Sequence, residues 1–155
     1  MTSLFFLGAT GYIGGALLPR VKEAFPDVTI TAIIRSADKK AAIEKNGADR
    51  VIIGSYQDLK TIHKAAFESD IVLNAASADD MDLVRTLITA LKERAKANKG
   101  TGRPKPILLH TSGTAIITVG SDGKFVKGAE RIWNVSGTIK RSRFFDADNF
   151  ICIGQ

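Results

Sequence analysis

Short apolar segments alternate with helical segments from residue 3 to residue 110, and no other feature of the chain constrains its fold as strongly. The five apolar segments are residues 3–7, 28–34, 50–53, 71–75 and 107–110. The second is rich in β-branched residues and almost wholly apolar, which is typical of a strand covered on both faces. Strands that alternate with helices predict an α/β fold with a doubly wound parallel sheet. Because crossovers between parallel strands are right-handed, we expect the strand order 3-2-1-4-5.

Four helices are expected between these strands. They cover residues 11–25, 38–46, 58–68 and 79–97. Thr10 is placed to cap the first helix, and Pro19 falls inside it, so we expect a kink or a late start there. Beyond Gly113 the pattern fades. Residues 114–119 are a candidate for one extra strand at the C-terminal end, and residues 127–155 have no clear period.

The composition bounds the class of protein. The 155 residues suit one domain, and 45% hydrophobic with 25% charged residues is typical of a globular chain. The single cysteine, Cys152, excludes an internal disulfide and fits a reducing compartment, so we expect a cytoplasmic protein. The first 18 residues are apolar, but four glycines interrupt them and no basic start precedes them, which argues against a signal peptide. No apolar stretch is long enough to predict a membrane span.

The net charge of +6 lies mainly in the last third of the chain. Residues 99–155 carry nine basic and four acidic side chains, whereas residues 1–98 carry thirteen and twelve. A solvated loop and tail explains this excess most simply. The alternative is that these basic side chains bind an anionic cofactor or an acidic partner. No zinc finger, homeodomain or RNA-recognition motif supports binding to nucleic acid, and the two histidines have no ligand-spaced partners for a metal.

The strongest local signal is a glycine loop between the first strand and the first helix, where residues 8–14 read GATGYIG. Gly8 permits a tight turn, Gly11 lets the backbone approach a pyrophosphate, and Gly14 lets the helix pack closely. The helix start offers amide groups to the phosphates. We therefore predict a dinucleotide site, and the alternative is a close-packed turn without a ligand. The pyrophosphate is expected beside the backbone of Thr10, Tyr12 and Ile13.

The end of the second strand indicates which dinucleotide binds. NAD-binding sites usually have an acidic residue there, which accepts from the ribose hydroxyls, but this chain has Arg35 and Ser36. An arginine can pair with the 2′-phosphate of NADP, and a serine can donate to it. We therefore favour NADP, with NAD as the alternative. The alternative interpretation is that these residues form an exposed basic loop that binds no ligand.

The stretch GATGYIGG resembles the extended and atypical short-chain dehydrogenase/reductase proteins, which include the epimerase/dehydratase-like and NmrA-like groups. Residues 74–77 (NAAS) resemble the family segment that lines the adenosine, which implies that Ala75 and Ala76 flank it. Residues 110–113 (HTSG) resemble the end of the fifth strand, which implies that Ser112 is the active-site serine. The resemblance covers about residues 3–120 and implies a Rossmann-type fold, NAD(P) binding and oxidoreductase chemistry on a small-molecule carbonyl substrate.

The chain departs from that family at three places. Gly54-Ser55-Tyr56 replaces a Gly-Asp-Leu whose Asp meets the adenine, so this contact is lost or made by Ser55. The Tyr-x-x-x-Lys motif that supplies the family's proton donor is absent from its place after the serine, because both tyrosines, Tyr12 and Tyr56, precede Ser112. His110 could supply a proton, but a satisfied strand-end histidine is the simpler interpretation. The family's C-terminal substrate lobe would need about another hundred residues.

Three hypotheses follow for the function. The first is an NADP-dependent oxidoreductase or epimerase-like enzyme with an unusual proton donor or a second chain that completes the site. The second is a non-catalytic redox sensor that binds a partner protein. The third is a shortened reductase product without function. We interpret residues 1–120 as the NAD(P)-binding domain and residues 121–155 as a basic extension without predicted structure. A homodimer or a partner protein is expected to bind through the fifth-strand edge or the basic tail.

Overall fold

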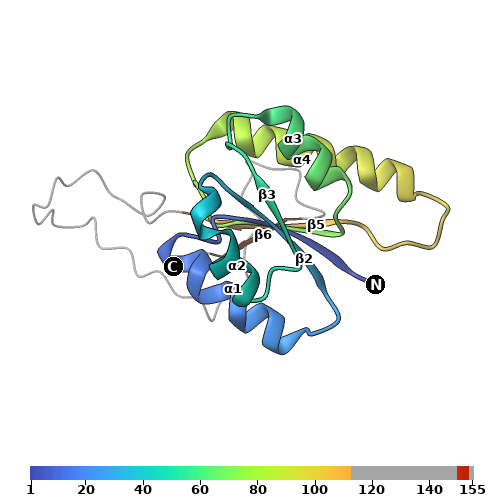
Figure 1. Ribbon diagram of the computed structural model, residues 1–155. Helices are drawn as coiled ribbons and strands as arrows, with labels where there is room; N and C mark the ends of the chain where they lie inside the picture. The colour runs from blue at the N-terminus through green and yellow to red at the C-terminus, as the bar shows by residue number, and fades with distance from the viewer. Residues whose placement is uncertain (113–149, 154–155) are drawn as a thin grey trace, which may run out of the picture.

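The computed structural model describes residues 1–112 and 150–153, and in these residues helices flank a parallel sheet on both faces (Figure 1). The strands are β1 (Ser3–Leu7), β2 (Thr29–Ile34), β3 (Arg50–Ile53), β4 (Ile71–Asn74), β5 (Ile107–Thr111) and β6 (Phe150–Ile153). The first five lie in the order 3-2-1-4-5, and every neighbouring pair is parallel. This confirms the predicted strand order and the Rossmann-type fold class.

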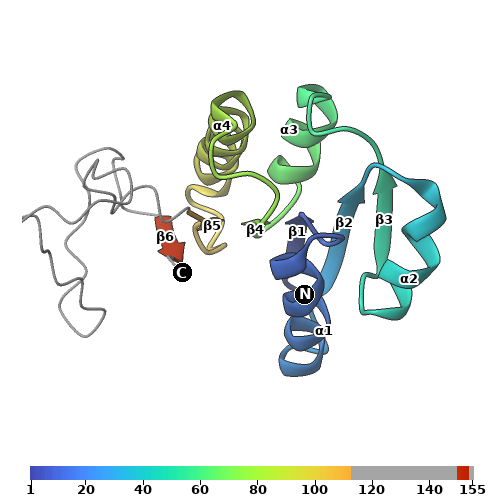
Figure 2. The ribbon, with the colours of Figure 1, turned by 90° about the vertical axis from the view of Figure 1, so that its left-hand side faces the viewer.

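Two helical layers cover the sheet. The helical elements are α1 (Tyr12–Ala24), the short 3-10 helix η1 (Ala37–Lys39), α2 (Lys40–Lys45), α3 (Leu59–Phe67) and α4 (Met81–Asn98). Seen along the sheet, α1 and α2 lie on one face, and α3 and α4 lie on the other (Figure 2). A doubly wound topology requires this division, because the chain crosses to opposite faces on either side of β1.

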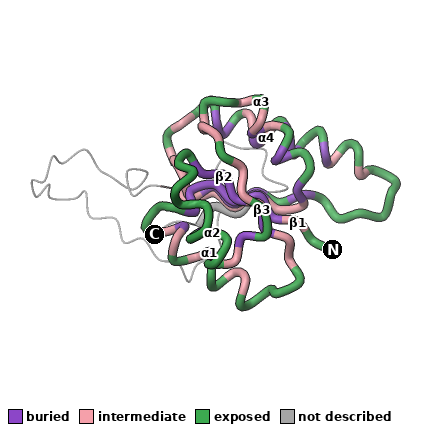
Figure 3. The backbone as a smooth tube through the Cα atoms, viewed as in Figure 1, coloured by how far each residue is buried: buried purple, intermediate pink, exposed green. Residues whose placement is uncertain are grey.

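The core is divided by the sheet into two clusters. In β1, the alternate side chains of Phe5 and Leu7 pack with α3 and α4, whereas those of Leu4 and Phe6 pack with α1 and α2. Successive residues of a strand point to opposite faces, so a central strand must be apolar at every position. Figure 3 shows the resulting band of buried backbone along the sheet.

The beginning of α1 differs from the expectation. Thr10 was expected to cap this helix, but the N-cap residue is Gly11, which has an extended backbone. No side chain accepts a hydrogen bond from the first turn of the helix. The prediction was wrong because the tight turn at Gly8, closed by a hydrogen bond from the Gly11 amide to the Gly8 carbonyl, delays the helix by one residue. Pro19 lies inside α1 without ending it.

Beyond β5 the sheet has one further strand. β6 pairs in parallel with β5, from Leu108↔Phe150 to Thr111↔Ile153. The predicted strand over residues 114–119, the boundary at residue 120 and most of the basic extension lie outside the described residues. None of the described helices is both long and apolar enough to span a bilayer.

A charged cluster ties the opposite, amino-terminal edge of the sheet together. The Asp70 carboxylate accepts hydrogen bonds from the Ser3 amide and the Ser3 hydroxyl, both at 2.9 Å. Arg94, which is only 9% exposed, pairs with Asp70 and also donates to the Phe67 carbonyl at 2.7 Å. One carboxylate thus connects the starts of β1 and β4 to helix α4.

Candidate functional site

The glycine loop lies at the carboxyl edge of the sheet, between β1 and α1. The strand order reverses here, since β2 and β3 follow on one side of β1 and β4 and β5 on the other. Open α/β sheets bind their ligands in the crevice at this kind of switch point. Gly8 has a φ of 88°, a conformation that favours glycine, and it starts the turn into α1.

Backbone atoms occupy the space beside two of the three motif glycines. A Cβ on Gly8 would lie 2.4 Å from the carbonyl carbon of Ala75, and a Cβ on Gly14 would lie 2.1 Å from the Gly8 oxygen. A Cβ on Gly11 would meet only the Gly8 oxygen, at 3.3 Å. Gly8 and Gly14 therefore hold the loop against its neighbours, while Gly11 is less closely packed, with one backbone atom near its Cβ position. We call this arrangement the glycine cradle (Gly8, Gly11 and Gly14).

The first turn of α1 carries no side-chain cap, in contrast to the helices on the other face. Asp58 caps α3 by accepting from the Thr61 amide at 3.2 Å, and Asp80 caps α4 by accepting from the Leu83 amide at 3.0 Å. The helix that follows the glycine loop thus begins without a carboxylate. An uncapped helix start attracts an anionic ligand through its free amides and its dipole.

The loop after β4 forms one wall of the cradle. Asn74 is fully buried; its side-chain oxygen accepts from the Ala76 amide at 3.1 Å, and its amide donates to the Ser77 carbonyl at 3.1 Å. The Ala75 amide in turn donates to the Leu7 carbonyl at 3.0 Å. These bonds fix Ala75 and Ala76 directly against Gly8.

His110 completes this network from β5. Its Nδ1 lies 3.1 Å from the Asn74 amide nitrogen, so this ring nitrogen acts as the acceptor. Burial lowers the pKa of His110, and the Ala78 backbone and the Asp79 charge offset it only partly. A neutral histidine with a hydrogen-bonded ring fits the interpretation of a satisfied strand-end residue better than that of a proton donor. Ser112 follows β5 directly and is half-buried.

Arg35 and Ser36 lie exposed after β2, at the same edge of the sheet. They differ in their contacts. A hydrogen bond from Ser36 lowers the pKa of the Asp38 carboxyl, so this hydroxyl is engaged with its own loop. Arg35 lies close enough to Tyr56 for its charge to act on the phenol. Of the two predicted phosphate contacts, Arg35 is thus the one not engaged with Asp38.

Tyr56 also belongs to this site, although the sequence analysis did not predict it. Its hydroxyl accepts a hydrogen bond from the Gly8 amide at 3.2 Å. The nearby Ser55 hydroxyl is bonded instead to the side chain of Gln57 and accepts from the Gln57 amide. The signal was the position of Tyr56 in the loop that follows β3, where the sequence departs from Gly-Asp-Leu.

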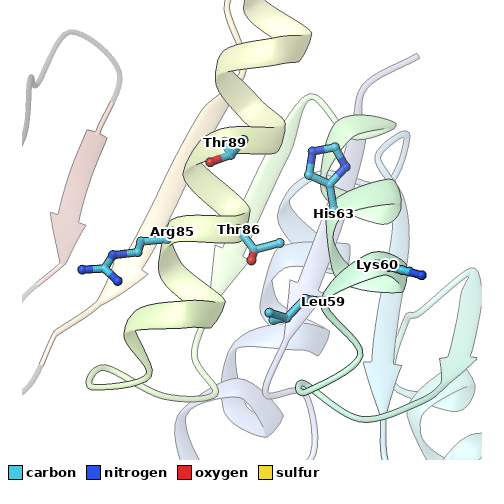
Figure 4. Close-up of a pocket in the computed structure, with 6 residues that line it drawn as sticks. All are labelled: Leu59, Lys60, His63, Arg85, Thr86 and Thr89. Carbon is cyan, nitrogen blue, oxygen red and sulfur yellow. The ribbon is translucent and has the colours of Figure 1, made fainter.

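A cavity of about 470 Å³ lies elsewhere, between α3 and α4. Figure 4 shows Leu59 and Thr86 pointing toward one another between the helices, while Lys60 and Arg85 point away. His63 on its rim pairs with Glu93 at 3.0 Å. Within residues 1–112 and 150–153, no group of three or more His, Cys, Asp or Glu residues could hold a metal ion.

Comparison with known proteins identifies the family of the chain. Residues 8–98, more than half of the chain, match a family described as NAD(P)H-binding. The oxidase ucsJ of an Acremonium species is 30% identical over 134 residues, which are 84% of this chain and 37% of that protein. The uncharacterized sugar epimerase YhfK of Bacillus subtilis is 33% identical over 95 residues, which are 61% of this chain and 44% of that protein. The chain therefore spans about two fifths of the length of these relatives.

The fold is similar to that of solved enzymes. A wide-type short-chain dehydrogenase/reductase from Veillonella parvula, solved with NADP, superposes with a TM-score of 0.52 at 20% identity. The match covers 74% of this chain and 49% of that protein.

Proposed function

Since the chain belongs to the NAD(P)H-binding family, we propose that it is the cofactor-binding part of an oxidoreductase similar to the short-chain dehydrogenases/reductases, with NADP as its cofactor. The observation that carries this proposal is the glycine cradle, which lies in front of a helix without a side-chain cap. The neighbour solved with NADP and the oxidase among the relatives are consistent with it. A bound nicotinamide would supply or accept a hydride.

Each part of the site has an expected role toward the dinucleotide. The glycine cradle and the first-turn amides of Tyr12 and Ile13, next to Thr10, would hold the pyrophosphate. Ala75 and Ala76 would flank the adenosine, because hydrogen bonds fix them beside Gly8. Arg35 would take the 2′-phosphate, with Ser36 as a second donor once it leaves Asp38.

The chemical step is less complete than the cofactor site. Ser112 would hydrogen-bond a substrate carbonyl, but a hydroxyl of ordinary pKa cannot act as a general base without help. No Tyr-x-x-x-Lys follows Ser112 in this sequence, since residues 56–60 (YQDLK) precede it, and His110 is engaged with Asn74. The proton donor for catalysis would therefore be a group other than a tyrosine of residues 113–155.

This missing motif favours a second candidate, a cytoplasmic NADP-binding sensor without catalysis. Its partner would bind through the basic extension or through the edge of the sheet. Because β6 pairs along β5, the outer strand on that side of the described sheet is β6.

Two measurements test these proposals. Titration with NADPH and NADH, followed by cofactor fluorescence, is expected to show micromolar binding with NADPH the tighter ligand. Absence of binding at millimolar cofactor would refute both candidates. NADPH oxidation with a panel of aldehydes and ketones separates them, because only the oxidoreductase turns over.

A further inference from the structure

Tyr56 links the glycine cradle to the end of β2, although it lies on neither. It follows β3, and its hydroxyl lies 3.2 Å from the Gly8 amide, which donates to it. Its ring packs against the core cluster beneath α3 and α4. The half-buried ring therefore holds the hydroxyl in a fixed place beside the first residue of the cradle.

The hydroxyl has a hydrogen left to donate. A phenol can accept one hydrogen bond and donate another. The Gly8 amide fills the acceptor role, and the Tyr56 hydroxyl donates no hydrogen bond within residues 1–112. Burial raises the pKa of Tyr56, and the Gly8 hydrogen bond and the Arg35 charge offset this only in part, so the phenol keeps its proton at neutral pH.

The position of the Tyr56 hydroxyl indicates which group of the cofactor it would donate to. In dinucleotide-binding sheets the pyrophosphate lies at the glycine loop, and the adenosine ribose reaches the end of the second strand. A group that is hydrogen-bonded to Gly8 and within range of the Arg35 charge is therefore placed between these two points. The chemistry it would recognise is an oxygen of the ribose 2′ position.

We propose that Tyr56 is a positioning and specificity-determining residue, which fixes the Gly8 amide and donates its O–H to the 2′-phosphate of NADP beside Arg35. The proposal rests on the proposed function, since it requires a dinucleotide in the cradle. A phenol O–H gives a charge-assisted hydrogen bond to a phosphate oxygen, which is shorter and stronger than a neutral one.

Binding measurements on Tyr56→Phe test the specificity. The variant keeps the ring in the core and loses only the hydroxyl. It is expected to weaken NADPH binding about tenfold and NADH binding much less, because only NADPH has the charged acceptor. Thr86→Val is the control, since it removes a hydroxyl on α4 that donates to the Asp82 carbonyl, outside the proposed site. Equal weakening of both cofactors, with a lower melting temperature, would reduce Tyr56 to a structural role and overturn the proposal.

A spectroscopic measurement on the unsubstituted protein removes the dependence on the variant's folding. The sequence has two tyrosines, so tyrosine labelled with ¹³C at Cζ gives two signals. The signal that remains in Tyr12→Phe, which replaces a fully exposed side chain, belongs to Tyr56. Addition of NADP is expected to shift this signal further than addition of NAD does. If both cofactors bind and the Tyr56 signal does not distinguish them, the proposal fails while the proposed function stands. If neither cofactor binds, the proposed function fails and the proposal with it.

Discussion

Replacing Gly14 with alanine tests whether the close approach of α1 to the glycine loop stabilises the fold. A Cβ there would lie 2.1 Å from the Gly8 oxygen and 2.6 Å from the Gly8 carbon, whereas ordinary contact begins at 3.4 Å. Both atoms belong to backbone that is fixed by the Gly11–Gly8 hydrogen bond, so no side chain can move aside. The helix and the loop must separate by about 1 Å to admit the methyl group.

The cost follows from two opposing terms. Forcing an extra methyl group into close-packed surroundings costs about 1–3 kcal/mol. Alanine recovers up to about 1 kcal/mol through its higher helix propensity. We expect Gly14→Ala to lower the free energy of unfolding by about 1–2 kcal/mol, which corresponds to roughly 2–8 °C in melting temperature for a chain of this size.

Gly15→Ala is the matched control for this prediction. Gly15 is the next residue of the same helix, but its Cβ would meet only the Ala9 oxygen, at 3.5 Å, which is ordinary contact. This variant gains helix propensity without the collision and should stabilise the protein by about 0.5–1 kcal/mol. Thermal and urea unfolding, followed by circular dichroism, measure both variants. Equal stability of the two alanine variants would refute the reasoning from close packing.

Three further predictions concern charges. Arg94→Met leaves the Asp70 carboxylate without its buried partner and should destabilise the fold by about 3 kcal/mol; adding Asp70→Asn should recover part of that loss in urea unfolding. Burial acts to raise the pKa of Asp70, but the Ser3 amide, Arg94 and the Ser3 hydroxyl together hold it below its ordinary value of 3.8. A depressed pKa adds stability that is fully present above the unfolded value and is lost as the pH falls through the folded one. The free energy of unfolding should therefore decrease below about pH 4, with a weaker decrease in Asp70→Asn. Arg35→Ala should weaken NADPH binding about tenfold or more and NADH binding little, whereas Lys39→Ala should change neither; equal losses in both variants would contradict a role for Arg35 in binding the 2′-phosphate.

The sheet could be predicted because its signal is local. Each strand is a short apolar segment, and the right-handed crossover rule converts their alternation into an order of strands. The N-cap residue of α1 could not be predicted from such a local signal. Thr10 has the right chemistry for a cap, but the turn at Gly8 determines where the helix begins.

Contacts between distant residues explain what the sequence did not show about the site. The hydrogen bond from Gly8 to Tyr56 joins residues 48 apart, and that between Asn74 and His110 joins residues 36 apart. No spacing rule connects such pairs, because their approach depends on the packing of β3 and β5 against their neighbours. The glycine spacing, by contrast, predicted the turn and the close packing that the Gly8 and Gly14 contacts display.

The central position of β1 also has a consequence for synthesis on the ribosome. β1 emerges before the other described strands, yet it pairs with β4 through Leu4↔Ile71, and Gly8 lies against Ala75. Until that part of the chain has been translated, the first strand has an unpaired edge and the glycine loop lacks one of its walls. Nascent chains that end before β4 are therefore expected to expose apolar surface and to depend on chaperones, whereas longer ones can close the sheet around β1.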